Sequence, residues 1–198
     1  MRIVIVGQKW LGVQVLNACT AAGHEVVAVV APSGDRLALA AHHLGLPLLA
    51  GSLVTGAHVP PCDLMLAAHA HAYITASARA KAAIGCAGFH PSLLPRHRGR
   101  DAIRWAIHMR ETVTGGTLYW MDDGVDTGPI IYQDWCHIAP SDTPAELWTR
   151  DLAPMGVRMF SRLIEQCAAG SPPAGSEQCD DLATWEPAFN REQLKRSN

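Results

Sequence analysis

The sequence predicts an α/β fold with a mostly parallel central sheet and helices on both faces. Two short β-branched runs, 3–6 and 25–30, enclose a stretch whose apolar residues recur at helical spacing, which is the pattern of a strand, a helix and a parallel strand. A later run, 63–68, is apolar almost throughout, as expected of a strand that is buried on both faces.

The other elements follow in chain order. Glycines at 23 and 45 close two expected helices. Further strands and helices are inferred from β-branched runs, from alanine-rich stretches and from the prolines that interrupt them. The expected helices are 11–22, 36–44, 74–84 and 101–110, with Asp101 as the N-cap of the last, and the expected strands include 46–49, 117–121 and 130–133. The arrangement is Rossmann-like.

The C-terminal part is expected to hold one long helical region and a tail. Thr143-Pro144-Ala145-Glu146 is a capping box with proline at the first helical position, and Pro154 is expected to kink or split the helix that follows. Beyond residue 170 the composition turns polar. We therefore predict a catalytic domain over 1–170 and a loosely packed extension over 171–198.

Composition narrows the classes of function. The chain has 198 residues, 48% of them hydrophobic, and a net charge of -2. No face rich in lysine and arginine stands out, which argues against a nucleic-acid partner, and no apolar stretch is long enough for a signal or membrane segment. From the lack of such a stretch we expect a cytoplasmic protein without a membrane partner. The six cysteines lack zinc spacing, so we expect neither disulfides nor a structural metal.

Two motifs point to an enzyme. The run Gly88-Phe89-His90-Pro91-Ser92-Leu93-Leu94-Pro95 carries an imidazole, and Asp122-Asp123-Gly124-Val125-Asp126-Thr127-Gly128-Pro129-Ile130 carries carboxylates. Each motif is a loop stiffened by proline or glycine, and such loops commonly hold catalytic groups on a rigid sheet. The pair predicts acid–base chemistry by His90 and Asp126.

These motifs resemble the folate-dependent formyltransferase family, which includes the methionyl-tRNA and glycinamide ribonucleotide formyltransferases. The resemblance implies the formyltransferase fold and 10-formyltetrahydrofolate as the co-substrate. It also implies that His90 stabilises or protonates the formyl oxygen while Asp126 supports His90 and proton removal. Through the same resemblance, the folate contacts fall on residues after the strand 63–68 and after residue 119, namely His71, Tyr73, Ile74, Trp120, Met121, Asp122, Asp123 and Gly124.

Two positions depart from the family pattern. Gly88 stands where the family has an asparagine that holds the formyl oxygen, and loss of one such donor costs about 10²–10³ in rate. Tyr119 stands where the family commonly has histidine, and its hydroxyl is a candidate replacement for the missing donor. Gly88 is also compatible with a backbone N–H or a water as the donor, with a different transferred group, or with lost catalysis.

The sequence therefore predicts a formyltransferase that acts on a small amine. The rivals are a formyl-folate hydrolase, a transferase of another one-carbon unit such as hydroxymethyl, and a folate-binding protein with weakened catalysis. The first loop carries bulky Trp10, which disfavours a ribonucleotide acceptor. His69 and His71 form a His-x-His pair without a third ligand, so a pocket wall is favoured over zinc. An oligomer stays open, with Trp105 or Trp135 as candidate contact residues.

Overall fold

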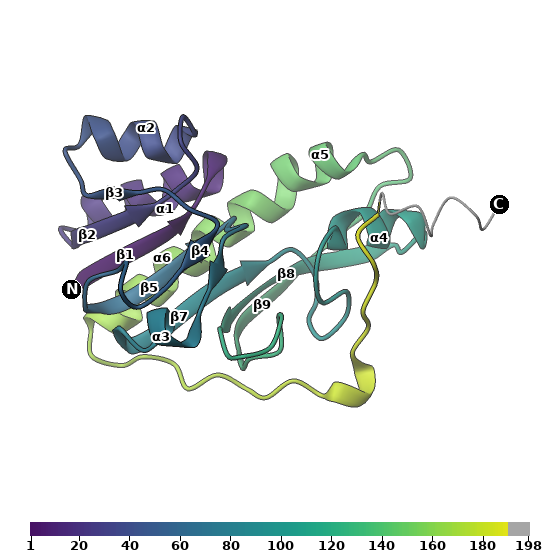
Figure 1. Ribbon diagram of the computed structural model, residues 1–198. Helices are drawn as coiled ribbons and strands as arrows, with labels where there is room; N and C mark the ends of the chain where they lie inside the picture. Colours follow the sequence, from purple (N-terminus) through teal and green to yellow (C-terminus); the bar gives the residue numbers. More distant parts are fainter. Residues whose placement is uncertain (190–198) are drawn as a thin grey trace. The chain divides into compact units, whose positions relative to one another are not determined.

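The computed structural model describes residues 1–189, which divide into two compact units (Figure 1). The first unit comprises residues 1–89 and 157–174. The second unit comprises residues 90–156 and 175–189. Each unit is described by itself below.

The first unit is built on a parallel sheet with the strand order β3-β2-β1-β5-β7. Its central strands are buried, and Ile3, Val4 and Ile5 of β1 are fully inaccessible to solvent. Strands β4 and β6 pair separately, also in parallel. The elements are β1 (Arg2–Gly7), α1 (Lys9–Ala21), β2 (Glu25–Val30), α2 (Arg36–His43), β3 (Leu48–Leu49), β4 (Leu53–Val54), β5 (Cys62–Ala68), β6 (Tyr73–Ile74), α3 (Ala76–Arg79) and β7 (Ala82–His90).

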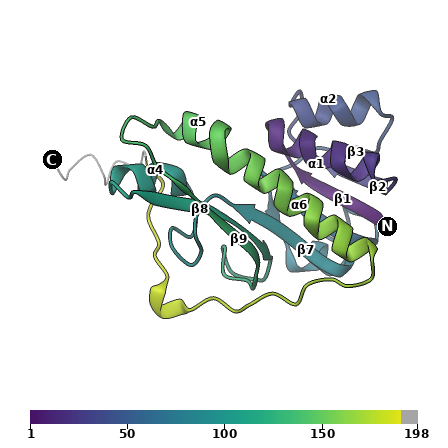
Figure 2. The same cartoon turned by 180° about the vertical axis from the view of Figure 1, so that it is seen from behind.

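Helices cover both faces of this sheet, as the sequence predicts. The strand order steps from β1 to β2 in one direction and from β5 to β7 in the other, so right-handed connections place α1 and α3 on opposite faces. In Figure 1 α3 lies in front of the sheet, whereas Figure 2 shows α1 and α6 (Ala153–Ala168) in front of it. The apolar side of α6 is buried at Phe160, Leu163 and Ile164.

The second unit contains an antiparallel hairpin and short helices. Strands β8 (Val113–Trp120) and β9 (Ile130–His137) pair with Thr117 opposite Gln133. Helices α4 (Ala102–His108) and α5 (Pro144–Leu147) belong to the same unit. The loop between the two strands carries Asp126.

The predicted capping box at the start of α5 is confirmed. The Thr143 hydroxyl accepts from the Glu146 N–H, and the Glu146 carboxylate accepts from the Thr143 N–H. After α5 the backbone forms a π-helical turn, Trp148–Leu152, which ends just before Pro154. Because proline has no N–H to donate to the preceding turn, it interrupts the helix at the place the sequence predicts.

The prediction of a helix over 74–84 is wrong. Only Ala76–Arg79 is helical, with the Thr75 side chain as its N-cap, and β7 already begins at Ala82. Ala82 pairs with Cys62 of β5, so sheet pairing overrides the helix propensity of an alanine-rich stretch. The number of helical residues was overestimated because alanine propensity says nothing about a neighbouring strand.

Two expectations about α4 also need correction. Asp101 is the N-cap residue by position, but its side chain makes no capping hydrogen bond and accepts from the Phe189 N–H instead. Trp105 is buried, with 7% of its surface exposed, and its indole N–H donates to the Pro187 carbonyl. Trp135, by contrast, is 58% exposed, so of the two candidate contact residues it alone offers a surface.

The segment 175–189 is bound to the second unit by hydrogen bonds, in contrast to the loose packing expected from its composition. Ser176 and Ile130 exchange two backbone hydrogen bonds, of 2.7 and 2.8 Å. Arg98 and Trp185 form an isolated parallel bridge. No helix within residues 1–189 is long and apolar enough to span a membrane.

Candidate active site

His90 is the last residue of β7, and its imidazole ring is buried, with 6% of the residue exposed. Its Nε2 lies 2.7 Å from the His97 carbonyl oxygen, and because a carbonyl only accepts, Nε2 must carry the proton. Its Nδ1 lies 3.4 Å from Asp126 Oδ2. The ring is therefore fixed on one side, with a carboxylate on the other.

Asp126 lies in the loop between β8 and β9 and has a backbone φ of 56°, in the left-handed region that non-glycine residues rarely adopt. Its Oδ1 accepts from the Tyr119 hydroxyl at 2.6 Å, and its Oδ2 accepts from the Gly99 N–H at 2.8 Å. A Cβ at Gly128 would stand 1.8 Å from the Trp120 carbonyl oxygen, so only glycine permits this loop path. The three predicted catalytic residues, His90, Asp126 and Tyr119, thus come together.

The motif loop after His90 is held by a buried hydroxyl. Thr117 of β8 donates to the Ser92 carbonyl at 2.7 Å and accepts from the Leu94 N–H at 3.1 Å. Gln133 of β9 donates to both the Thr117 hydroxyl and the Leu94 carbonyl. Sequence reasoning missed these supports, although the threonine beside two glycines in an otherwise apolar strand was a usable signal.

His97 supports His90 from behind. Its carbonyl accepts from His90, while its own ring, 2% exposed, lies between two carboxylates. Its Nε2 is 3.1 Å from Glu111 Oε1, and its Nδ1 is 3.0 Å from Glu186 Oε2. The contact to Glu111 is a hydrogen bond, whereas Nδ1 and Glu186 Oε2 lie at ion-pairing distance without hydrogen-bond geometry. Only His90 of this arrangement was predicted from the sequence.

His90 and Asp126 are arranged for acid–base chemistry at a carbonyl carbon. An imidazole whose Nε2 proton is held by a carbonyl can present only Nδ1 to a reacting group. A carboxylate that accepts from Tyr119 and Gly99 is held in place as an acceptor and is a candidate for receiving a proton. The distance of 3.4 Å between Nδ1 and Asp126 Oδ2 is long for a hydrogen bond, as apo catalytic contacts often are.

The residues predicted to contact folate are divided between the two units. In the second unit, Trp120 ends β8 and the turn after it is fixed by Asp122, whose Oδ1 accepts from the Gly124 N–H and the Thr127 hydroxyl. Met121 and Asp123 belong to the same turn. In the first unit, Tyr73 is 59% exposed, Ile74 is buried at 2%, and His71 precedes both in the loop after β5.

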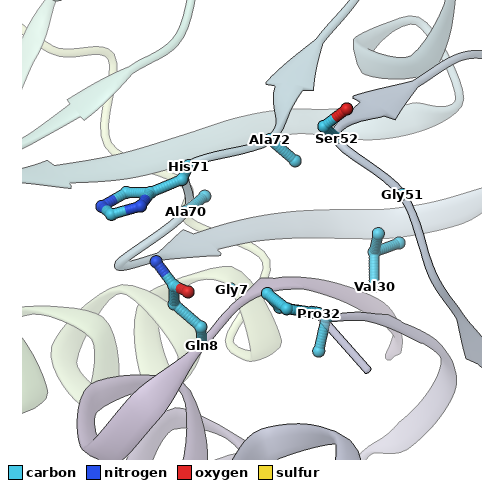
Figure 3. Close-up of a pocket in the computed structure, with 10 residues that line it drawn as sticks. Gly7, Gln8, Val30, Pro32, Gly51, Ser52, Ala70, His71 and Ala72 are labelled. Atoms are coloured by element: carbon cyan, nitrogen blue, oxygen red, sulfur yellow. The ribbon is translucent and has the colours of Figure 1, made fainter. Parts of the chain in front are cut away.

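The first unit holds a cavity of about 190 Å³ at the carboxyl ends of its strands. Figure 3 shows the Gln8 side chain with its amide nitrogen directed toward the His71 ring. Small residues form most of the remaining wall, which consists of Gly7, Val30, Ala31, Pro32, Gly51, Ser52, Ala70 and Ala72. Ligands of parallel α/β sheets commonly bind at this edge.

His69 precedes this cavity's His71 and has a positive φ of 57°. Burial, together with the smaller effects of the neighbouring Lys9 and His71, lowers the pKa of His69 from its ordinary value of 6.5 to about 4. The ring is therefore neutral at physiological pH. His69 and His71 have ring centroids 5.5 Å apart.

Comparison with known proteins identifies relatives over the whole chain. The family model described as formyl transferase matches residues 58–163. The mitochondrial 10-formyltetrahydrofolate dehydrogenase of Mus musculus is 30% identical over all of this chain, which spans only 23% of that protein. The methionyl-tRNA formyltransferase of Syntrophus aciditrophicus is 36% identical over 55% of this chain and 34% of its own length.

Solved structures share the fold. Glycinamide ribonucleotide transformylase 1 from Symbiobacterium toebii matches with a TM-score of 0.75 and 22% identity, over 90% of this chain and 93% of its own. The N-formyltransferase from Helicobacter canadensis, in complex with folinic acid and dTDP-3-aminofucose, matches with a TM-score of 0.78 and 18% identity, over 93% of this chain and 70% of its own.

Proposed function

The chain belongs to the formyl transferase family, and on that premise we propose that it transfers a formyl group from 10-formyltetrahydrofolate to a small amine, with His90 and Asp126 as catalytic residues. The observation that carries the proposal is the fixed His90 ring, which the His97 carbonyl holds on one side and Asp126 faces on the other. A purely structural histidine would not need a carboxylate that is itself held in a left-handed backbone conformation.

The proposed reaction proceeds by addition and elimination. The amine lone pair attacks the formyl carbon, and the carbonyl electrons move onto the oxygen, where His90, carrying a proton on Nδ1 as well as on Nε2, stabilises the charge by donating from Nδ1. Asp126 accepts the proton that the amine nitrogen loses. The intermediate then collapses, the bond from the formyl carbon to N10 of the folate breaks, and Asp126 passes the proton taken from the amine to N10, so that the N-formylated amine and tetrahydrofolate leave and Asp126 is again a carboxylate.

Tyr119 supports Asp126 in this scheme. Its hydroxyl has one proton, and that proton is donated to Asp126 Oδ1 at 2.6 Å. In this state it steadies the carboxylate. Donation to the formyl oxygen, as a substitute for the amide that Gly88 lacks, would require the hydroxyl to exchange partners once substrate is bound.

We further propose that reduced folate contacts the turn formed by Trp120, Met121, Asp122, Asp123 and Gly124, with His71, Tyr73 and Ile74 as additional contacts from the first unit. Asp122 already binds Thr127 and the Gly124 N–H, which makes the turn a preformed surface. The folinic acid in the Helicobacter canadensis complex supports a reduced folate as the ligand class. The 10-formyltetrahydrofolate dehydrogenases among the relatives support 10-formyltetrahydrofolate, rather than free formate, as the formyl donor.

The deciding experiment is a titration of the protein with 10-formyltetrahydrofolate. Tryptophan fluorescence reports binding, while tetrahydrofolate and formate are quantified with and without a panel of primary amines that includes glycinamide and an amino-sugar nucleotide. We expect micromolar binding and release of tetrahydrofolate that depends on one of the amines. A formylated amine in the product mixture establishes the transfer.

The remaining outcomes separate the rival functions. Formate and tetrahydrofolate in equal amounts without any amine would identify a hydrolase, and a changed folate without formate would identify another one-carbon transfer. Binding with no turnover, unaltered in His90→Ala, would identify a folate-binding protein, and recovery of turnover in Gly88→Asn would trace the loss to the missing amide. No binding at millimolar folate would overturn the proposal.

A further inference from the structure

The C-terminal segment 175–187 contacts the supports of both proposed catalytic side chains. We propose that this segment positions the catalytic pair, with Gln178 holding the Asp126 loop and Glu186 holding the carbonyl that fixes His90. The inference rests on the proposed function of His90 and Asp126. Neither Gln178 nor Glu186 hydrogen-bonds to a catalytic side chain directly, so both are positioning residues.

Both the nitrogen and the oxygen of the Gln178 side-chain amide form hydrogen bonds. Its Nε2 donates to the Asp126 carbonyl at 2.9 Å and to the Gly128 carbonyl at 2.8 Å. Its Oε1 accepts from Arg98 Nε at 3.1 Å and Arg98 Nη2 at 2.9 Å. The amide orientation is determined by these partners, because a flipped amide would set its oxygen against two carbonyls. One side chain therefore closes the loop on both sides of residue 127.

Arg98 makes this contact rigid. It is only 4% exposed, and besides Gln178 it binds Asp180 Oδ1 at 2.8 Å. The Trp185 ring lies 5.9 Å from its guanidinium carbon. A buried guanidinium needs acceptors, so Arg98 selects the glutamine oxygen and leaves the amide nitrogen to the Asp126 loop. The neighbouring Gly99 N–H binds the Asp126 carboxylate itself.

Glu186 acts through His97. Residue 97 has a φ of 56°, an uncommon conformation for histidine, and its N–H donates to the Thr184 hydroxyl at 2.8 Å. Glu186 Oε2 lies 3.0 Å from the Nδ1 of the same residue. Thr184 thus holds the backbone of His97 by a hydrogen bond, and the Glu186 carboxylate lies at ion-pairing distance from its ring without hydrogen-bond geometry. Its carbonyl, which binds His90 Nε2, is placed by the C-terminal segment.

These two sets of contacts fix the geometry of His90 and Asp126 from different sides. One fixes the backbone of Asp126, and the other fixes the acceptor behind His90. The contact between the two side chains is 3.4 Å, so a small shift of either support changes the approach of Nδ1 to the carboxylate. Misplacement by about 1 Å can lower a rate by roughly 10²-fold without removing a catalytic group.

The test compares Gln178→Met and Glu186→Gln with Glu177→Gln, a matched change at the exposed neighbouring position. The assay uses 10-formyltetrahydrofolate and the amine that the titration described above identifies. We expect kcat to fall about 10–100-fold in the first two variants, with KM for folate within about threefold of the wild type. Glu177→Gln keeps both constants. Because unfolding would confuse the result, circular dichroism and melting temperature are recorded, and Gln178→Asn and Thr184→Val serve as milder replacements.

A readout that needs no turnover keeps this inference separate from the proposed function. Nitrogen-15 spectra of the histidine side chains report whether the His90 Nε2–H is held in a hydrogen bond. We expect a slowly exchanging Nε2 proton in the wild type and in Glu177→Gln, and fast exchange in Glu186→Gln. If the wild type does not turn over folate, the proposed function fails, while the spectra still decide the positioning. Folded variants with wild-type kcat and wild-type spectra would overturn the inference.

Discussion

Two glutamine side chains show how differently the two units treat their polar groups. Gln178 in the second unit has all of its amide positions bonded, to Asp126, Gly128 and Arg98. Gln8 in the first unit is 7% exposed and lines the cavity, and its Nε2 has no hydrogen-bond partner among residues 1–189. The Gln178 amide is fully hydrogen-bonded within the protein, whereas the Gln8 amide nitrogen can still donate to a ligand.

The two regions are suited to different tasks. The second unit holds a carboxylate and an imidazole in a set geometry before any substrate arrives, so its polar groups are preorganised for chemistry. The cavity of the first unit combines an unbonded amide with small walls and the neutral ring of His69 nearby. A ligand can therefore accept a hydrogen bond from Gln8 Nε2 without displacing a protein partner of that nitrogen.

The largest effect is expected from Asp126→Asn. The amide keeps the volume but offers only one oxygen, so it cannot accept from both Tyr119 and Gly99 and cannot take a proton. We expect kcat to fall by about 10²–10⁴, measured as tetrahydrofolate release at saturating folate. Asp134→Asn, an exposed change on β9, is the control. A variant that retains more than a tenth of the wild-type rate would remove Asp126 from the catalytic pair.

A smaller effect is expected from Tyr119→Phe. The change removes one hydroxyl that donates to Asp126 Oδ1, and a hydrogen bond to a charged group contributes about 1.5–3 kcal/mol. We expect the free energy of unfolding to fall within this range and kcat to fall about tenfold.

A double-mutant cycle with Asp126→Asn checks the assignment. If the hydroxyl acts through the carboxylate, the two losses are not additive, because the second change finds the contact already broken. Additive losses would mean that Tyr119 acts on substrate or structure by another path, which would restore its candidacy as the donor that replaces the missing amide at Gly88.

The sequence predicted the parallel sheet, the capping box and the pairing of His90 with Asp126, because each depends on local periodicity or on a motif. It did not predict Gln178, Glu186 or His97 as supports. Their partners lie at sequence separations of up to 89 residues, as for His97 and Glu186 (186 − 97), and a lone glutamine in a polar tail carries no pattern. The polar composition of 175–189 suggested loose packing, whereas its polar groups are the means by which it is bound.

The same change, glutamine to methionine, at both positions tests whether the two amides differ in hydrogen bonding. Gln178→Met removes the side-chain donor to the Asp126 and Gly128 carbonyls and one of the two side-chain acceptors of the buried Arg98 guanidinium, so we expect a loss of about 2 kcal/mol in the free energy of unfolding. Gln8→Met removes an amide whose nitrogen has no protein partner among residues 1–189, so we expect no loss and a gain of up to about 1 kcal/mol. Urea unfolding of both variants measures this. Equal losses would show that the Gln8 amide is as well bonded as that of Gln178.

The smallest effect concerns the pH dependence of stability through His69. The pKa of His69 falls from 6.5 to about 4 on folding, mainly through burial, so between these values the unfolded chain binds a proton that the folded chain does not. Stability is therefore unaffected above about pH 7.5, declines as the pH falls through 6.5, and stops declining below about pH 4. His69→Asn tolerates the positive φ and removes the titrating group.

Urea midpoints measured from pH 8 to pH 4 compare the two proteins directly. Because the ring is partly exposed and its field is screened, we expect the wild type to lose only about 1 kcal/mol more than His69→Asn over this range. Lys9, His71 and Asp35, which act on the same ring, are present in both proteins, so their own titration largely cancels in the difference. Parallel curves would mean that the His69 ring is as well hydrated as in the unfolded chain, and the region around it would then hold water that a ligand must displace.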